Sequence, residues 1–306
     1  MTTTIDSSVP ANDSELTSLR HQFLTPFQSL LNVAQILTSH ALLAAWFYFG
    51  CKIFPLGLYI VISLPICLIH QRAMSEWIHE GAHFNLVCDR RWNDWLANVL
   101  AGFWLVVTID SYRTVHFLHH ASKYFFIKGD PDTNFLDISS RQEFQRAILR
   151  DLFGITMFGQ YRRFRDRKDR APKKSLWFAA IVTVQCLNLA ILIHLGRVDT
   201  YVLYYGSLAF LYPLLNRIRV YGQHVAVDGK GKSHFKDSAI SRTIDAGFFD
   251  RLFFTSSLLL YHYEHHQFPW LPYRALKKKC VFSSDINRYS ESRWSILKAI
   301  YSGLPE

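Results

Sequence analysis

Histidines gather in three short boxes of this chain, at spacings that suit metal binding. The boxes are HEGAH at 79–83, HFLHH at 116–120 and HYEHH at 262–266, and one more histidine follows at position 224. Residues three or four apart lie on one face of a helix, so each box can direct two or three imidazoles at one point. The candidate metal ligands are His79, His83, His116, His119, His120, His224, His262, His265 and His266.

Nine imidazoles are more than one tetrahedral zinc ion needs, because zinc usually takes four ligands or keeps one position for water. Two metal ions are therefore the simpler interpretation. Neutral imidazole binds iron, zinc and copper, so the ligand type alone leaves the metal open among these three.

Two other interpretations of the boxes remain open at this point. HEGAH also fits the HExxH pattern of zinc metalloproteases, in which Glu80 would act as general base beside His79 and His83. A zinc peptidase does not require two further HxxHH boxes, which argues against that interpretation. A non-catalytic membrane protein that stores or senses metal is the second alternative, and it would need no substrate and no electrons.

The elements that must position the boxes are apolar helices. The sequence predicts an all-α integral membrane fold, with four transmembrane helices in two hairpins at about 30–50, 53–75, 176–195 and 200–218. The apolar stretch at 95–109 has only 15 residues, fewer than the roughly 20 that cross a bilayer core. We expect it to be re-entrant or interfacial.

Charge predicts the orientation of these spans. Residues 123–174 contain 13 Lys/Arg against 7 Asp/Glu, whereas the hairpin turns contain almost none, and positive loops tend to stay in the cytoplasm. We therefore expect a cytosolic loop at 110–174, a cytosolic tail at 219–306, and both termini in the cytoplasm. All nine histidines then lie on the cytoplasmic side, in a helical cap.

The rest of the sequence limits the domain organisation and the possible partners. We expect residues 1–20 to be disordered and residues 21–306 to form a single domain. The net charge of +10 and the basic run at 162–174 beside a span favour membrane lipids with anionic headgroups as partner, and no nucleic acid. The five cysteines show no CxxC pairing. AVDGKGKS at 226–233 fits a permissive phosphate-loop pattern, but that motif requires a strand before it and a helix after it.

The chain resembles the membrane fatty acid desaturase and hydroxylase superfamily over roughly residues 30–276. The resemblance rests on the three boxes and on phrases in the family order, which are WND at 92–94, DSYRTVHFLHH, GDPD at 129–132, RIRVYGQH at 217–224 and YHYEHHQFPWLPYRAL from 261. It implies a membrane-bound non-haem di-iron enzyme in which the nine histidines hold two Fe ions, O2 is a co-substrate, and hydrogen is removed from an unactivated C–H bond.

The resemblance also implies the partners. A fatty acyl chain would be desaturated or hydroxylated, while a carotenoid hydroxylase or ketolase, or a fatty acid decarboxylase that makes terminal alkenes, are the alternatives. The sequence contains no HPGG segment for haem, no cysteine cluster for iron–sulfur and no convincing dinucleotide fingerprint. We therefore expect a separate electron donor, either ferredoxin or a cytochrome b5-like protein.

One departure concerns the third box. Many relatives have an asparagine shortly before its tyrosine, where this chain has Leu258, Leu259 and Leu260. Ligand histidines usually donate their second N–H to a carboxylate or carbonyl. The candidates to orient the ligands are Glu80, Asp94, Asp110, Arg113, Asp130, Asp132, Asp228 and Glu264. His70 lies inside the second span, where a polar side chain needs a partner; we do not expect it to bind metal.

Overall fold

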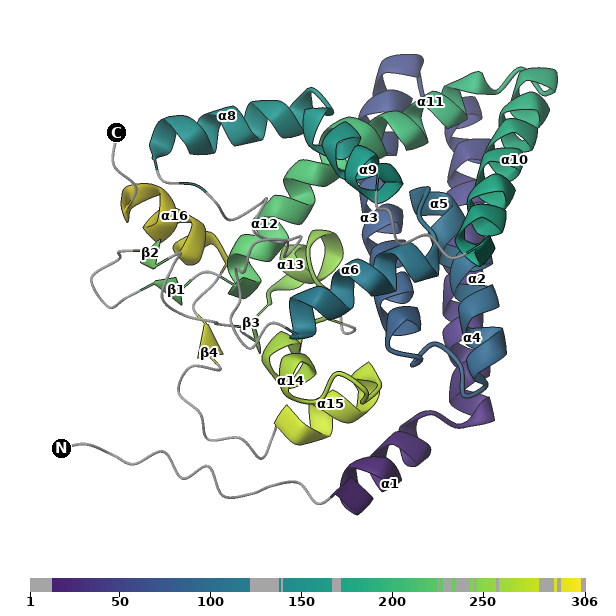
Figure 1. The fold of residues 1–306 in the computed structure, drawn as a ribbon. Coiled ribbons are helices and arrows are strands. Elements are labelled where there is room, and N and C mark those ends of the chain that lie inside the picture. Colours follow the sequence, from purple (N-terminus) through teal and green to yellow (C-terminus); the bar gives the residue numbers. More distant parts are fainter. Residues whose placement is uncertain are drawn as a thin grey trace.

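Helices make up most of the described chain. The computed structural model describes residues 13–121, 138, 140–166, 172–224, 226–227, 233–234, 241, 243–244, 246–256, 259–280, 289–290 and 293–303. Figure 1 shows the long helices α2 and α10 on one side of the molecule and the shorter α8 and α16 on the other. The strands are two-residue pairs, so the fold in the described ranges is a helical assembly.

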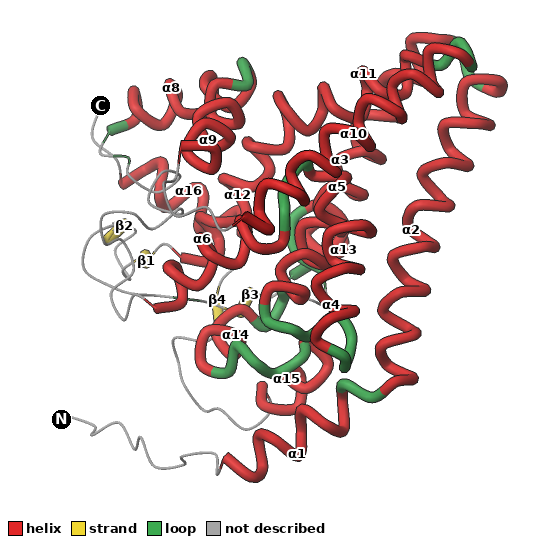
Figure 2. Tube along the Cα trace, turned by 45° about the vertical axis from the view of Figure 1, so that its right-hand side comes forward, coloured by secondary structure: helices red, strands yellow, loops and turns green. Residues whose placement is uncertain are grey.

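Three helices are long and apolar enough to cross a membrane. These are Pro26–Ile53 (α2), Leu56–Ala82 (α3) and Leu176–His194, the larger part of α10 (Pro172–His194). They coincide in position with the expected spans at about 30–50, 53–75 and 176–195. Figure 2 shows α2 along one edge of the molecule. It begins at Pro26, after Thr25, whose side chain accepts a hydrogen bond from the Gln28 N–H.

The expected span at 200–218 takes a different form. Its residues form α11 (Val198–Gly206), a π-helical segment η2 (Ser207–Leu211) and α12 (Tyr212–His224). None of the three pieces reaches 18 residues, so this helical run is not among the candidate spans. The Gln71 amide of α3 donates to the Tyr204 carbonyl and the Ser207 hydroxyl, where the π segment begins. Helical structure continues to His224, beyond the expected end at 218.

The short apolar stretch at 95–109 does not form a straight span. Helix α4 (Arg90–Leu96), the π-helical η1 (Ala97–Gly102) and α5 (Phe103–Leu105) lead to Val106, which has the left-handed φ of 57°. Helix α6 (Ile109–Ala121) then leaves at 87°. Such a bend is what a broken span or a re-entrant segment shows, as the length of this stretch predicts.

The tight return after α5 depends on Gly102. A Cβ added there would collide with the carbonyl oxygen of Val107, and the Val107 N–H donates to Gly102 O at 3.0 Å. Gly102→Ala should therefore destabilise the protein by about 1–3 kcal/mol, since backbone atoms cannot move aside. Thermal unfolding in detergent measures this. Gly57→Ala is the control, because no atom lies within 4 Å of its added Cβ, and an unchanged midpoint for Gly102→Ala would contradict the prediction.

The N-terminal segment corrects one expectation. Helix α1 (Asp13–Phe23) begins well before residue 20, so residues 13–20 are helical and not disordered. Leu16 is buried in a cluster with Leu271, Ala275 and Leu276, and the last two lie on α15 (Tyr273–Cys280). An apolar contact distant in sequence stabilises this otherwise polar helix.

The remaining elements surround the ends of α3 and α12. They are α8 (Arg141–Leu152), α9 (Ile155–Asp166), α13 (Phe248–Phe253), α14 (His262–Gln267) and α16 (Arg293–Gly303). Strands β1 (Ala226–Val227) and β2 (Ser233–His234) pair antiparallel, and β3 (Thr243–Ile244) pairs in parallel with β4 (Tyr289–Ser290). The phosphate-loop pattern at 226–233 thus begins and ends in one antiparallel pair, which is not the context that a phosphate loop requires.

Candidate metal centre

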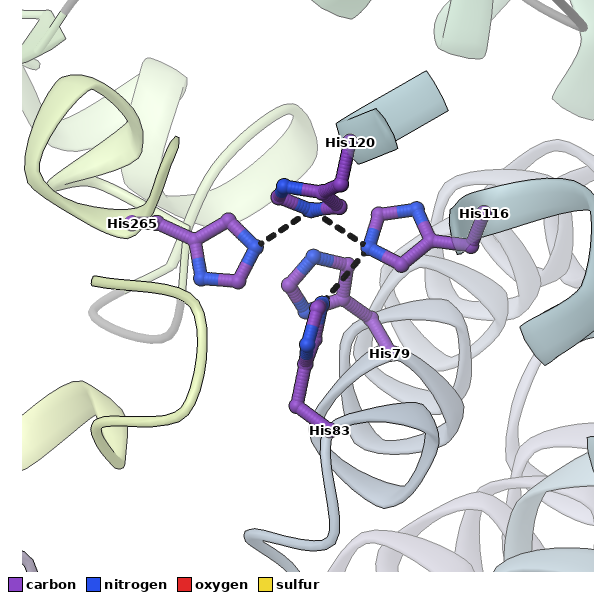
Figure 3. Close-up of side chains that lie close together, drawn as sticks. All are labelled: His79, His83, His116, His120 and His265. Atoms are coloured by element: carbon purple, nitrogen blue, oxygen red, sulfur yellow. Dashed lines mark hydrogen bonds between the residues drawn. The ribbon is translucent and has the colours of Figure 1, made fainter. Parts of the chain in front are cut away.

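The eight histidines of the boxes and His224 come together in two groups. The five-histidine cluster contains His79, His83, His116, His120 and His265, and the four-histidine cluster contains His119, His224, His262 and His266. Within each cluster the ligand nitrogens all lie within 4.8 Å of one another. Figure 3 shows the five rings of the larger cluster converging on one point from different elements.

The second and third boxes each contribute histidines to both clusters, whereas the first box contributes to one. On α6, His116 and His120 are four residues apart and both enter the five-histidine cluster, whereas His119, which lies between them, enters the four-histidine cluster. On α14, the pair four apart, His262 and His266, belongs to the four-histidine cluster, and His265 points to the other. The rings of His120 and His266 stack at 4.5 Å where the clusters adjoin.

Distances in the five-histidine cluster fit ligands of a single ion. The Nε2 atoms of His83 and His116 are 2.8 Å apart, those of His116 and His120 3.0 Å, and those of His120 and His265 3.1 Å. Metal–imidazole bonds are about 2.0–2.1 Å long, so two ligands at right angles have nitrogens about 3.0 Å apart, against about 3.4 Å in a tetrahedron. Five donors at this spacing exceed a tetrahedral set.

His79 gives the sharpest test of whether a metal fits. It is buried, and neither of its ring nitrogens has a hydrogen-bond partner. Its ring centroid lies 4.5 Å from that of His116 and 4.4 Å from that of His265. A buried unpaired imidazole is costly. A cation among these nitrogens would satisfy it, so the donor set fits a metal ion.

The four-histidine cluster is built from the end of α12 and from α6 and α14. His224 and His262 place their Nε2 atoms 2.8 Å apart, and His262 and His266 place theirs 3.1 Å apart. The His119 ring completes the group, 4.8 Å from the His224 ring. This cluster has one donor fewer than its neighbour. Leu259 and Leu260, which precede the third box, are buried, and Leu258 lies outside the described residues.

Burial keeps these imidazoles neutral. Desolvation, and then the neighbouring histidines, lower the pKa of His262, His265 and His266 well below the ordinary value of 6.5. Neutral imidazole has a free lone pair, which is the form that binds metal. The site is therefore set up for coordination at neutral pH.

The same shifts predict a pH dependence for the metal-free protein. Because the pKa values of these histidines are lower in the folded state than in the unfolded state, the unfolded chain takes up more protons below about pH 6.5. The thermal midpoint should be highest above pH 6.5 and fall as the pH is lowered toward 5. Thermal unfolding at stepped pH measures this. His262→Ala should show a shallower fall, and equal slopes for variant and parent would contradict the prediction.

Among the residues expected to orient the ligands, Glu80 and Glu264 are buried beside the boxes. Glu80 Oε1 lies 3.6 Å from His79 Nδ1, and its Oε2 accepts from the Tyr273 N–H at 3.3 Å. Glu264 accepts from the Thr243 hydroxyl, which ties α14 to β3. Glu80 thus lies beside the His79 ring without a hydrogen bond to it, whereas Glu264 holds the helix of the third box.

The backbone of the first box is held by Arg113, which also pairs with Asp94 and lies near Asp110. Arg113 donates to both carboxylate oxygens of Asp94, at 2.9 and 2.5 Å, and lies 3.7 Å from Asp110 Oδ1. The same guanidinium donates to the carbonyls of Gly81 and Ala82, the last residues of α3. These groups fix the end of the helix that carries His79 and His83. Asp130, Asp132 and Asp228 lie outside the described residues.

Sequence reasoning missed Glu76, one turn before His79. Its carboxylate accepts from Arg72 at 2.7 Å and from the Ser256 N–H at 2.8 Å, and also from the Ser256 hydroxyl. It thereby joins α3 to the segment ahead of the third box. A carboxylate inside an apolar stretch is costly and marks a site with a partner, and that signal was available in the sequence.

His70 has partners, but they are not metal ligands of the boxes. Its Nε2 lies 2.9 Å from His40 Nδ1 and its Nδ1 lies 2.9 Å from the Tyr204 hydroxyl, while His40 Nε2 reaches the Leu100 carbonyl at 2.8 Å. The chain of hydrogen bonds links α2, α3, η1 and α11. It supplies the partner that a buried intramembrane histidine needs, as expected.

Comparison with known families gives one finding. The family model described as Fatty acid desaturase matches residues 52–279, a range that contains all nine histidines of the two clusters. No curated protein gives a significant match.

Proposed function

The chain belongs to the fatty acid desaturase family, and we propose that it is an O2-dependent di-iron oxidoreductase that removes hydrogen from an unactivated C–H bond of a fatty acyl chain. Family membership supports an oxidoreductase that acts on fatty acids in a membrane. The two histidine clusters, with their converging ring nitrogens and the buried, unpaired imidazole of His79, are the observation that carries the proposal.

The donor sets favour iron over zinc. Five nitrogens at about right-angle spacing suit a coordination number above four, whereas zinc sites are nearly always four-coordinate. Two iron ions, one in each cluster, would supply the redox chemistry that activates O2 with two external electrons, which zinc cannot do. The stacked rings of His120 and His266 show that the two clusters adjoin.

The protein's own side chains would bind the two ions, orient the ligands and shield the centre from bulk water. The histidines direct their ring nitrogens at two points, Glu80 lies 3.6 Å from His79, and Arg113 with Asp94 fixes the end of α3. His79, His119, His262 and His265 are all buried. Such burial excludes bulk water from the ligands and limits unproductive side reactions during oxidation.

We also propose that the centre and both termini lie on the cytoplasmic side, with an external ferredoxin or cytochrome b5-like donor. The excess of Lys/Arg at 123–174 supports this orientation. The fold agrees, because α1 packs against α15, which follows α14 of the centre, so the N-terminal helix lies at the same end as the histidines.

Lipid analysis tests the proposal. Membranes that express the chain with a reductase and a ferredoxin should gain unsaturated or hydroxylated acyl chains, detected by gas chromatography with mass spectrometry. The matched control carries His120→Ala, which removes one donor of the five-histidine cluster. Terminal alkenes would indicate a fatty acid decarboxylase instead, and oxidised carotenoids would indicate a carotenoid hydroxylase or ketolase. Identical lipids from parent and control would contradict oxidation at this site.

A further inference from the structure

A groove lies between α8, α12 and α16, on the side of the molecule away from α2 (Figure 1). We call it the α16 groove. It has a volume of about 360 Å³, within the range of about 300–1,000 Å³ that small-molecule sites occupy. Its walls are apolar and include Phe144 and Ile148 of α8, Leu214 and Ile218 of α12, and Trp294 and Leu297 of α16.

One wall of the groove lies outside the range that the family model matches. Helix α16 begins at Arg293, after the family match has ended at residue 279. It supplies Trp294 and Leu297 at helical spacing, so the face of α16 that lines the groove is an apolar stripe. The groove therefore has two walls, α8 and α12, inside the range that the family model matches and one wall, α16, outside it.

Charge restricts what the groove can hold. Its described lining residues include two cations, Arg217 and Lys298, and no carboxylate. Arg217 is already neutralised, because its guanidinium donates to both oxygens of buried Asp151 at 2.6 and 3.0 Å. Lys298 is exposed, and no ion pair joins it to a described residue. In the part of the chain that the structure describes, the groove thus combines an apolar interior with the Lys298 ammonium at its rim.

The exposed apolar side chains next to the groove favour a ligand that comes from the membrane. Beyond the groove, α8 and the start of α9 expose Leu149, Phe153 and Phe158, at 52%, 69% and 68% of their surface. An exposed apolar series of this kind marks a surface that meets a membrane or an apolar ligand. Amphiphiles in a bilayer would therefore be concentrated beside the groove.

We propose that the α16 groove binds a single-chain anionic amphiphile, with the hydrocarbon chain between α8, α12 and α16 and the carboxylate or phosphate on Lys298. A long-chain fatty acid and a lysophospholipid share this chemistry. The inner wall includes Tyr221, three residues before His224 on the same helix, so the ligand contacts the helix that carries one histidine of the four-histidine cluster. Binding requires no turnover, and its test is independent of the proposed oxidation.

Photolabelling tests this site. The metal-loaded protein in neutral detergent is irradiated with palmitic acid that carries a diazirine at its chain end, and adducts are mapped by peptide mass spectrometry. Adducts should fall on α8, α12 and α16. Leu297→Trp, which fills the groove, and Lys298→Glu, which reverses the rim charge, should each reduce them at least tenfold.

Matched controls keep the result interpretable. Leu187→Trp changes an exposed leucine of α10 that does not line the groove, and Lys277→Glu reverses an exposed charge on α15; both should label like the parent. Unchanged metal content in Leu297→Trp shows that the variant is folded. Competition by unlabelled palmitic acid or by lysophosphatidic acid identifies the source of the anion. Undiminished labelling of α16 in Leu297→Trp, or labelling confined to other elements, would overturn the proposal.

Discussion

His119→Ala and His120→Ala should each remove one metal ion, but from different clusters. The two histidines are adjacent in one box, yet His119 faces His224 and His266, whereas His120 faces His116 and His265. Each variant should retain about half of the parent's metal. Changing residues that only support metal ligands costs about 10–100-fold, so losing a ligand should reduce product formation by more than about 100-fold.

Metal analysis of the purified variants, together with product analysis, measures both effects. His194→Ala is the matched control, because His194 is exposed at the end of α10 and belongs to neither cluster. It should keep the parent's metal content and activity. If His119→Ala and His120→Ala lost the same ion, as judged by the spectrum of the remaining metal, the division into two clusters would be wrong.

Arg293→Ala should have the second large effect, through the four-histidine cluster. Arg293 is fully buried and donates to Asp250 at 2.6 Å, to the Thr255 hydroxyl at 3.1 Å and to the Arg219 carbonyl at 3.1 Å. Removing it leaves the buried Asp250 carboxylate unpaired, which costs about 3–5 kcal/mol. It also frees the last turns of α12, so the ion bound by His224 should be lost first.

The thermal midpoint and the metal content measure these two consequences. Arg293→Met combined with Asp250→Leu is the matched control, since replacing both members of a buried ion pair by apolar residues is often neutral for stability. The double variant should recover much of the midpoint. A loss of the five-histidine ion before the other, or a double variant less stable than Arg293→Ala, would contradict a role for Arg293 in holding α12.

Local spacing predicted which histidines could act together, because positions three and four apart share a helix face wherever the helix lies. It could not predict how they divide. That His265 joins the α3 histidines while His262 and His266 join His224 depends on how α6, α12 and α14 cross. The nine candidates were therefore identified from sequence, but the five-and-four arrangement emerges only from the packing of helices distant in the chain.

Hydropathy predicted the positions of three spans, since their length and composition are local properties, but α3 continues to Ala82, beyond the expected end at 75. It missed the π-helical interruption at Ser207–Leu211, where Gln71 from another helix pairs with Tyr204 and Ser207. It also missed α1, whose Leu16 packs against Leu271 and against Ala275 and Leu276 of α15. Arg293 carried no signal at all, because one arginine near a chain end resembles any surface charge until its partners at 218–219 and 250–255 are known.

The metal content of the purified wild-type protein tests the central claim most directly. Elemental analysis should give about two iron ions per chain, one for each histidine cluster, and Mössbauer spectroscopy of protein grown on ⁵⁷Fe should resolve two inequivalent sites in equal amounts. Five donors in one cluster and four in the other require that inequivalence. One zinc ion per chain, with no iron after reconstitution under reducing conditions, would contradict the di-iron account.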